Sequence, residues 1–299
     1  MTDLTTNKRA ETPRRRARVS LNWDWLGVAP YLVFVALFLI APVFYLVNGA
    51  LQTPDGRYSP ETLAGLLDPQ IRASYWLSIR LSLASALTGT VLGLALAYAV
   101  CMGRLPARVR RAFMPFSGVA SNFAGVPLAF SFIATLGRLG LVTLILRDVV
   151  GINIYAAGFN LFSFWGLALT YLYFQLPLML LMIAPAMEGL RPEWREAAES
   201  LGATGRQYWM RVAIPILAPS VGGCFLLLFA NAFGTLATIY ALTSGNFPVV
   251  PIVLFQQIRG NVLYNPNLGY ALAVGMILIM AVSNTLYFIL RRRAERWQK

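Results

Sequence analysis

Long apolar blocks alternate with polar segments along the whole chain. Six of these blocks contain twenty or more residues, and they cover about 26–47, 75–102, 112–136, 163–187, 216–242 and 268–290. An α-helix of about twenty apolar residues is long enough to cross a hydrocarbon core of about 30 Å. The pattern therefore predicts an all-α integral membrane protein with six transmembrane helices.

The polar segments divide the chain into parts. We expect a basic N-terminal tail at 1–22, a first transmembrane helix with its following loop at 23–74, a transmembrane domain at 75–290, and a basic tail at 291–299. The basic start followed by an apolar run also fits a signal peptide. That run is longer than a typical signal-peptide core, which favours an uncleaved first span. The short apolar stretch at 139–146 cannot cross a bilayer, so it lies at the interface or re-enters the membrane.

Positive charge gathers in alternate polar segments. Both tails, the loop after the second block and the segment after the fourth block hold 19 Lys and Arg residues, whereas the other three loops hold 5. Segments rich in Lys and Arg stay in the cytoplasm, so both termini are predicted to be cytoplasmic. A net charge of +13 could also indicate nucleic acid. The distribution of the charge instead favours membrane lipid as the surface that it meets, and no nucleic-acid partner is expected.

Composition excludes several kinds of chemistry. The chain is 58% hydrophobic and contains no His, which is the commonest general base and metal ligand. Its only lysines, Lys8 and Lys299, do not follow a glycine-rich loop, so no phosphate-binding loop for ATP can form. Cys101 and Cys224 lie in or at the edge of apolar blocks, which argues against a disulfide framework. We expect no catalytic residue, cofactor or metal in this chain, and no enzymatic activity.

The segment 191–214 lies between two apolar blocks and is predicted to form two short helices joined by a glycine. Pro192 suits a first helical position, and Glu193 and Glu196 suit the positive end of a helix. Residues at positions i, i+3, i+4 and i+7 form an apolar stripe, namely Trp194, Ala197, Ala198 and Leu201. Gly202 is a natural stop. This first half is therefore a short amphipathic helix.

A second helical run follows the glycine. Thr204 opens it, and Gln207 three residues later can complete a capping box. Trp209 begins its apolar side, which also includes Met210 and Val212. Pro215 is predicted to end the unit at the start of the next apolar block. The whole segment is short, amphipathic and set against a membrane surface.

The spacing of these residues resembles the Glu-Ala-Ala motif of permease subunits in binding-protein-dependent ABC importers. The matching positions are Glu196, Ala197, Ala198, Gly202, Trp209, Val212, Ile214 and Pro215. That family usually has Phe or a similar bulky residue in place of Trp209, and Leu in place of Ile214. An amphipathic helix that only lies on lipid is the alternative. It would not need this fixed spacing over about twenty residues.

The resemblance implies the type I ABC importer permease fold in a bacterial inner membrane. It also implies a separate ATPase subunit that binds ATP and Mg. The residues implied to couple to this subunit are Glu196, Ala197, Ala198, Leu201, Gly202, Trp209, Ile214 and Pro215. Further partners implied are a second permease subunit, homologous or identical, and a periplasmic or lipid-anchored solute-binding protein.

Polar side chains inside the predicted spans are candidates for a solute pathway. They are Asn122, Tyr171, Gln175, Asn231 and Thr235. Hydrogen bonding between helices is the alternative for each of them. Asn231 and Thr235 lie in one patch with Gly234 and are the strongest candidates, because small residues there let helix backbones approach closely.

The stretches 123–129, 242–245 and 265–269 resemble permeases of the spermidine/putrescine group. This implies a polyamine or a related small charged molecule as the solute. Relatives of that group are also assigned to aminoethylphosphonate, iron or thiamine uptake. An ion-coupled secondary transporter is the rival function, but such carriers usually place ionisable groups near mid-membrane. The predicted spans contain almost no acid, and Glu188 lies at the end of one.

Overall fold

The computed structural model describes residues 24–53, 56–59, 61–103, 105–259 and 266–295. In these ranges the regular structure is helical, apart from one isolated bridge between Gln52 and Tyr58. The helices are α1 (Asp24–Val35), η1 (Ala36–Ile40), α2 (Ala41–Ala50), α3 (Glu61–Ala64), η2 (Gly65–Leu67), α4 (Pro69–Cys101), α5 (Ala107–Asn122), α6 (Val126–Leu136), α7 (Leu141–Asp148), α8 (Phe164–Glu188), α9 (Pro192–Ser200), α10 (Gly205–Tyr208), η3 (Trp209–Ala213), α11 (Ile214–Phe233), α12 (Ala237–Thr243), α13 (Val250–Arg259) and α14 (Pro266–Glu295). The predicted tail at 1–22 lies outside the described residues.

The chain forms two compact units, residues 1–45 and 46–299. The described part of the first unit comprises α1, the π-helical turn η1 and the start of α2, and it is apolar on all sides. Phe34 and Phe38 stack along it, with ring centroids 5.0 Å apart. A helix that is apolar all round suits a hydrocarbon environment.

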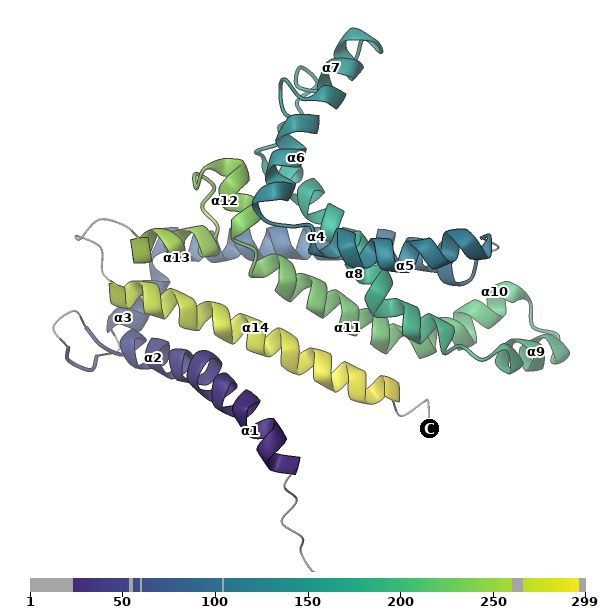
Figure 1. Cartoon of the computed structure of the whole chain (residues 1–299), viewed down its shortest axis with the longest axis horizontal. Helices are drawn as coiled ribbons and strands as arrows, with labels where there is room; N and C mark the ends of the chain where they lie inside the picture. The colour runs from purple at the N-terminus through teal and green to yellow at the C-terminus, as the bar shows by residue number, and fades with distance from the viewer. Residues whose placement is uncertain (1–23, 54–55, 60, 104, 260–265, 296–299) are drawn as a thin grey trace, which may run out of the picture. The chain divides into compact units, whose positions relative to one another are not determined.

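Among the described residues, six helical segments are long and apolar enough to cross a membrane, as the sequence predicts. They are Gly27–Ala50, Pro69–Cys101, Val126–Asp148, Phe164–Glu188, Gly205–Phe233 and Asn267–Arg292. Figure 1 shows α4, α8, α11 and α14 as the long helices of the second unit, with α9 and α10 beyond one end of α8 and α11 and with α13 toward the other end.

The second unit is built on the packing of α4 against α8. Gly89 and Gly93, four residues apart, are both buried on α4. A Cβ atom added to Gly89 would lie 2.5 Å from the side chain of Gln175, and one added to Gly93 would lie 2.5 Å from Met179. Only glycine therefore allows the two helix backbones to come this close, and close backbone packing is what holds helices together in lipid.

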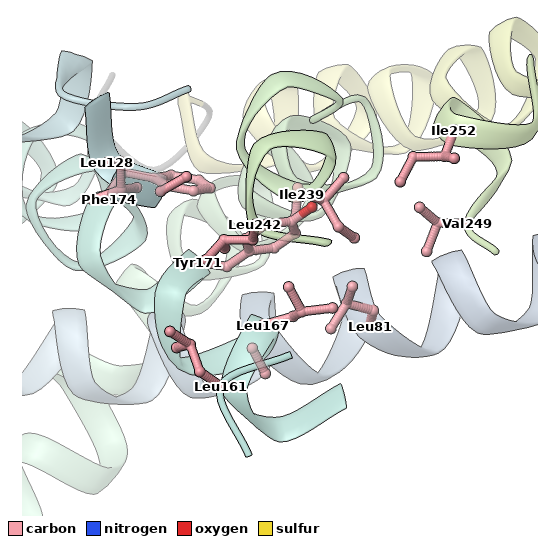
Figure 2. Close-up of a cluster of buried hydrophobic side chains, with 13 residues drawn as sticks. Leu81, Leu128, Leu161, Leu167, Tyr171, Phe174, Ile239, Leu242, Val249 and Ile252 are labelled. Atoms are coloured by element: carbon pink, nitrogen blue, oxygen red, sulfur yellow. The ribbon is translucent and has the colours of Figure 1, made fainter. Parts of the chain in front are cut away.

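A cluster of buried apolar side chains joins the helices at the α12 and α13 end of the unit. Figure 2 shows Tyr171 and Phe174 of α8 near residues from α4, α6 and α12. The backbone is also tied across helices at this end, because Val250 N donates to Ser78 Oγ at 2.8 Å. Gly125 N donates to Thr238 Oγ1 at 2.9 Å. The short segments α12 and α13 are thus fixed to the long helices.

Three predicted boundaries are wrong. The second span begins at Pro69 instead of 75, because Asp68 caps its N-terminus by accepting from Gln70 N at 2.8 Å. The predicted third span at 112–136 is divided into α5 and α6 at Gly125, whose φ of +75° breaks the helix. The candidate span there runs over 126–148, so the stretch at 139–146 belongs to it instead of lying apart.

The last third of the chain brings three further corrections. The predicted fifth span at 216–242 ends at Phe233, where Gly234 caps α11 before the separate helix α12. The loop predicted from 243 to 267 contains the ten-residue helix α13. The helix α14, which contains the sixth span, continues to Glu295, so it takes in the start of the predicted basic tail. The remaining division of the chain into tails and domains stays a prediction.

Candidate functional site

The segment that carries the Glu-Ala-Ala motif forms a helix, a glycine turn and a second helix, as predicted. Pro192 occupies the first turn of α9, and Glu193 lies beside it at the positive helix end. Gly202 follows α9 with φ of +78°, a conformation that strongly favours glycine. Thr204 and Gln207 form the predicted capping box: Thr204 N donates to Gln207 Oε1 at 2.8 Å, and Gln207 N donates to Thr204 Oγ1 at 3.3 Å.

The predicted apolar stripe of α9 is only half correct. Trp194 and Ala198 pack on a buried cluster, called here the Leu217 cluster. Its members include Met187, Leu190, Tyr208, Ala213 and Leu217. Ala197 is exposed, and Leu201 is 89% exposed. Leu201 is the C-cap residue, so its side chain has left the helical stripe. The exposed face of α9 therefore carries an apolar side chain directed to solvent.

Charged groups cover the rest of the exposed face. Arg195 Nε donates to Glu199 Oε1 at 2.9 Å in an i, i+4 ion pair, and this bond raises the pKa of the Arg195 guanidinium. Glu196 is exposed, and its carboxylate has no ion pair or hydrogen bond among the described residues. A carboxylate that has no such bond among the described residues is available to a partner, and the docking role of Glu196 stays a prediction.

Pro215 does not end the unit, contrary to the prediction. The helix continues from Gly205 through the π-helical turn η3 into α11 and on to Phe233. Ile214 N donates to the carbonyl of Trp209, five residues back, so the hydrogen-bond register has shifted just before the proline. Pro215 is the second residue of α11 and has no N–H to donate, and the π-helical turn lies directly before it. The second half of the motif is therefore continuous with a membrane-spanning helix.

Trp209 connects the motif to a second span. Its ring meets the ring of Tyr98 near the end of α4 edge to face, with centroids 5.3 Å apart. Ile214 and Pro215 are exposed at the start of α11. Of the predicted contact residues, Glu196, Ala197, Leu201 and Gly202 are thus exposed around α9, whereas Ala198 and Trp209 are half-buried against the body of the protein.

The predicted solute-pathway residues do not form one lining within this chain. Gln175 is fully buried and donates to Ser85 Oγ at 3.2 Å, and the Tyr171 hydroxyl donates to the Thr235 carbonyl at 3.5 Å. These contacts fit the alternative of bonds between helices. Asn122 and Asn231 are exposed on α5 and α11. A pathway role for the five residues stays a prediction.

Two features of this region were missed by sequence reasoning. Arg110 of α5 pairs with Glu188 at the end of α8 at 2.7 Å. An apolar groove of about 810 Å³ also lies between α4 and α11. Neither could be found from the sequence, because the partners are about eighty or more residues apart in the chain. Within the described ranges no group of three His, Cys, Asp or Glu side chains could hold a metal ion.

Comparison with known proteins agrees with this geometry. Residues 89–299 match the family described as the binding-protein-dependent transport system inner membrane component. The sulfate transport system permease protein CysT of Escherichia coli is 27% identical over 244 residues, which is 78% of this chain and 81% of that protein. The molybdenum transport system permease protein ModB of Mycobacterium bovis is 25% identical over 266 residues, which is 87% of this chain and 90% of that protein.

The fold is also found in solved structures. A chain of a bacterial ABC transporter for import of the acidic polysaccharide alginate superposes with a TM-score of 0.66 and 18% identity, over 92% of this chain and 97% of that chain. A chain of the bacterial alginate transporter in complex with its alginate-bound periplasmic protein superposes with a TM-score of 0.64 and 16% identity, over 94% of this chain and 99% of that chain.

The chain therefore belongs to the family of inner-membrane components of binding-protein-dependent transport systems. It is a multi-pass inner-membrane permease subunit of an ABC importer.

Proposed function

We propose that this permease forms part of the solute pathway and couples it to a separate ATPase subunit through the segment from α9 to η3. The observation that carries the proposal is the exposed face of α9. The side chains of Glu196 and Leu201 are exposed on this face. The opposite face, with Trp194 and Ala198, packs against the Leu217 cluster. A helix with one anchored face and one free face suits a docking element.

The anchored face explains how a push on α9 would reach the membrane. The Leu217 cluster contains Met187 of α8 and Leu217 of α11, so a displacement of Trp194 moves side chains of both helices. Trp209 adds contact with α4 through Tyr98. Packed interiors transmit such displacements because they are dense and resist compression. ATP and Mg would be bound by the partner ATPase, whose closure supplies the push.

The chain's orientation is part of the same proposal. The segment from α9 to η3 must face the cytoplasm to meet an ATPase, and the excess of Lys and Arg on that side supports this. With the even number of spans found among the described residues, both termini would then lie in the cytoplasm. A second permease, homologous or identical, would complete the pathway, and a solute-binding protein would deliver the solute from the periplasm.

We propose a small charged solute, and the charges of the spans favour an anion over a polyamine. The described membrane-spanning segments contain two acidic residues, Asp148 and Glu188, each at a span end. Asp148 pairs with Arg147 at 2.7 Å, and Glu188 pairs with Arg110 at 2.7 Å. Neither carboxylate is left to bind a polycation. The related permeases for sulfate and molybdenum handle anions or oxyanion-forming elements, which supports the same choice.

Uptake by the reconstituted importer tests both parts of the proposal. Proteoliposomes with the permease, its ATPase and its binding protein should accumulate solute only with internal ATP. Glu196→Lys should abolish uptake without loss of membrane insertion, whereas Glu193→Lys, on the same helix, should keep most of it. Accumulation driven by an ion gradient without ATP would instead support a secondary transporter. The class of solute is tested by adding sulfate, molybdate or putrescine as a competitor. Inhibition of uptake by sulfate or molybdate indicates an anion, whereas inhibition by putrescine indicates a polyamine.

A further inference from the structure

An apolar groove runs along the membrane-spanning surface between α4 and α11. Its volume is about 810 Å³. The side chains that line its walls are apolar except for two hydroxyl groups and the indole N–H of Trp209. From α4 and α8 they are Leu87, Thr90, Val91, Leu94, Ala95, Tyr98 and Met187, and from η3 and α11 they are Trp209, Ile214, Leu217, Ala218, Val221, Gly222 and Phe225. No Asp, Glu, Lys or Arg is among them. The groove therefore suits an apolar occupant.

The length of the groove indicates what kind of occupant fits. On α4 the lining extends from Leu87 to Tyr98, and on α11 from Ile214 to Phe225. Eleven residues at a rise of 1.5 Å correspond to about 16 Å on each wall. This is about half of a hydrocarbon core of about 30 Å, or one leaflet. A transmembrane helix of another subunit would need a groove along the full core, whereas an acyl chain needs one leaflet.

The two ends of the groove differ in character. One end lies among apolar side chains in the middle of α4 and α11. The other end is formed by the aromatic pair of Tyr98 and Trp209, next to the Glu-Ala-Ala segment. Tyr and Trp gather at the boundary between hydrocarbon and headgroups, because their rings are apolar and their polar atoms reach water. The aromatic end is thus the headgroup end.

A positively charged side chain lies near the aromatic end of the groove. Arg211 belongs to the same π-helical turn as Trp209, which lines the aromatic end of the groove. It is exposed and forms no ion pair among the described residues. The nearby acids Glu188 and Glu199 are already paired, with Arg110 and Arg195 respectively. The charge of Arg211 is therefore available to an anionic headgroup.

We propose that this groove binds an anionic phospholipid of the leaflet that faces the Glu-Ala-Ala segment. One acyl chain lies between α4 and α11, and the headgroup phosphate lies at Arg211 beyond the Tyr98–Trp209 pair. The lipid would touch both the motif, at Trp209, and the span that the motif contacts. The site requires only insertion in a membrane, so it does not depend on the identity of the solute or on the ATPase.

Quenching of tryptophan fluorescence by brominated lipids tests the site, because Trp209 lines it. The assembled importer is placed in bilayers that contain brominated phosphatidylglycerol or brominated phosphatidylcholine. The signal of Trp209 is the difference between the natural protein and Trp209→Phe. The concentration of brominated lipid for half-maximal quenching should be about fivefold lower for phosphatidylglycerol than for phosphatidylcholine. One Arg near the membrane surface raises the affinity for an anionic lipid by roughly that factor. In the Arg211→Gln variant, the two lipids should quench Trp209 at nearly equal concentrations.

A pair of matched variants separates the groove from the surrounding lipid surface. Ala95→Phe fills the groove and should lower the quenching of Trp209, whereas Ala99→Phe, on an exposed position of α4 outside the lining, should leave it unchanged. If the Ala95→Phe variant does not insert into the membrane, the proposal is still tested by comparing the lipid preference of the natural protein with that of Arg211→Gln. Equal quenching by both lipids in the natural protein would overturn the proposal in favour of ordinary boundary lipid. Absence of quenching by either lipid would overturn it in favour of a protein occupant.

Discussion

The rings of Tyr98 and Trp209 meet edge to face with their centroids 5.3 Å apart. Tyr98 lies near the end of a membrane-spanning helix, and Trp209 belongs to the π-helical turn inside the Glu-Ala-Ala motif. This contact joins the second half of the motif to α4, whereas Trp194 and Ala198 join its first half to the Leu217 cluster. The motif is therefore anchored at two places and exposed between them.

Loss of this aromatic contact is expected to separate ATP hydrolysis from transport. Trp209→Ala removes an edge-to-face pair worth about 0.5–1.5 kcal/mol beyond the buried area. The ratio of solute transported to ATP hydrolysed should fall, while the ATPase remains bound through α9. Trp209→Phe keeps a ring at this position and should keep most of the coupling. The measurement is uptake and phosphate release in the same proteoliposomes. An unchanged ratio in the alanine variant would remove Trp209 from the coupling path.

The close packing of α4 on α8 makes a prediction about stability. A Cβ atom on Gly93 would lie 2.5 Å from Met179 Cβ, so Gly93→Ala should force the two helices apart. Overpacking of this kind costs about 1–3 kcal/mol. Gly118→Ala is the matched control, because nothing lies within 4 Å of its added Cβ atom. Thermal unfolding in detergent should show a lower midpoint for the first variant only. Equal unfolding midpoints for the two variants would mean that α4 and α8 are not packed closely enough at Gly93 to exclude a methyl group.

The turn at Gly202 predicts an order among substitutions. Its φ of +78° costs about 1–2 kcal/mol for an ordinary L-residue, whereas Asn tolerates the region better. No atom lies within 4 Å of an added Cβ, so steric conflict inside the chain does not contribute. Uptake should therefore fall in the order natural protein, Gly202→Asn, Gly202→Ala, with Gly202→Asp lowest because it adds charge at the docking face. Equal uptake by the alanine variant and the natural protein would contradict the need for this turn.

Asn231 is the best test of the pathway prediction. Its side chain is exposed on α11, so Asn231→Leu leaves no buried polar partner unsatisfied and should change stability by less than about 0.5 kcal/mol. If Asn231 faces the solute, the concentration for half-maximal uptake should change while the ATPase still co-purifies. Asn284→Leu, at an exposed position on α14, is the control and should transport normally. Identical transport by both variants would show that Asn231 does not line the path.

The sequence alone determined the six apolar spans found among the described residues, the glycine turn at Gly202 and the capping box at Thr204. These features depend on the apolar length of a segment or on bonds between residues a few positions apart, so they are visible locally. The family motif could be recognised from the sequence because its spacing is fixed within one segment.

Tertiary structure decided what depends on distant residues. The helix passes Pro215 because a π-helical turn shifts its hydrogen bonds, and apolar periodicity does not reveal such a shift. Leu201 is exposed and Trp194 is packed, although both fit one stripe, because α9 ends before Leu201. The groove between α4 and α11 exists only when two segments more than a hundred residues apart in the chain lie side by side. Local sequence sets the helices, and their packing decides which side chains remain free for partners, lipid or solute.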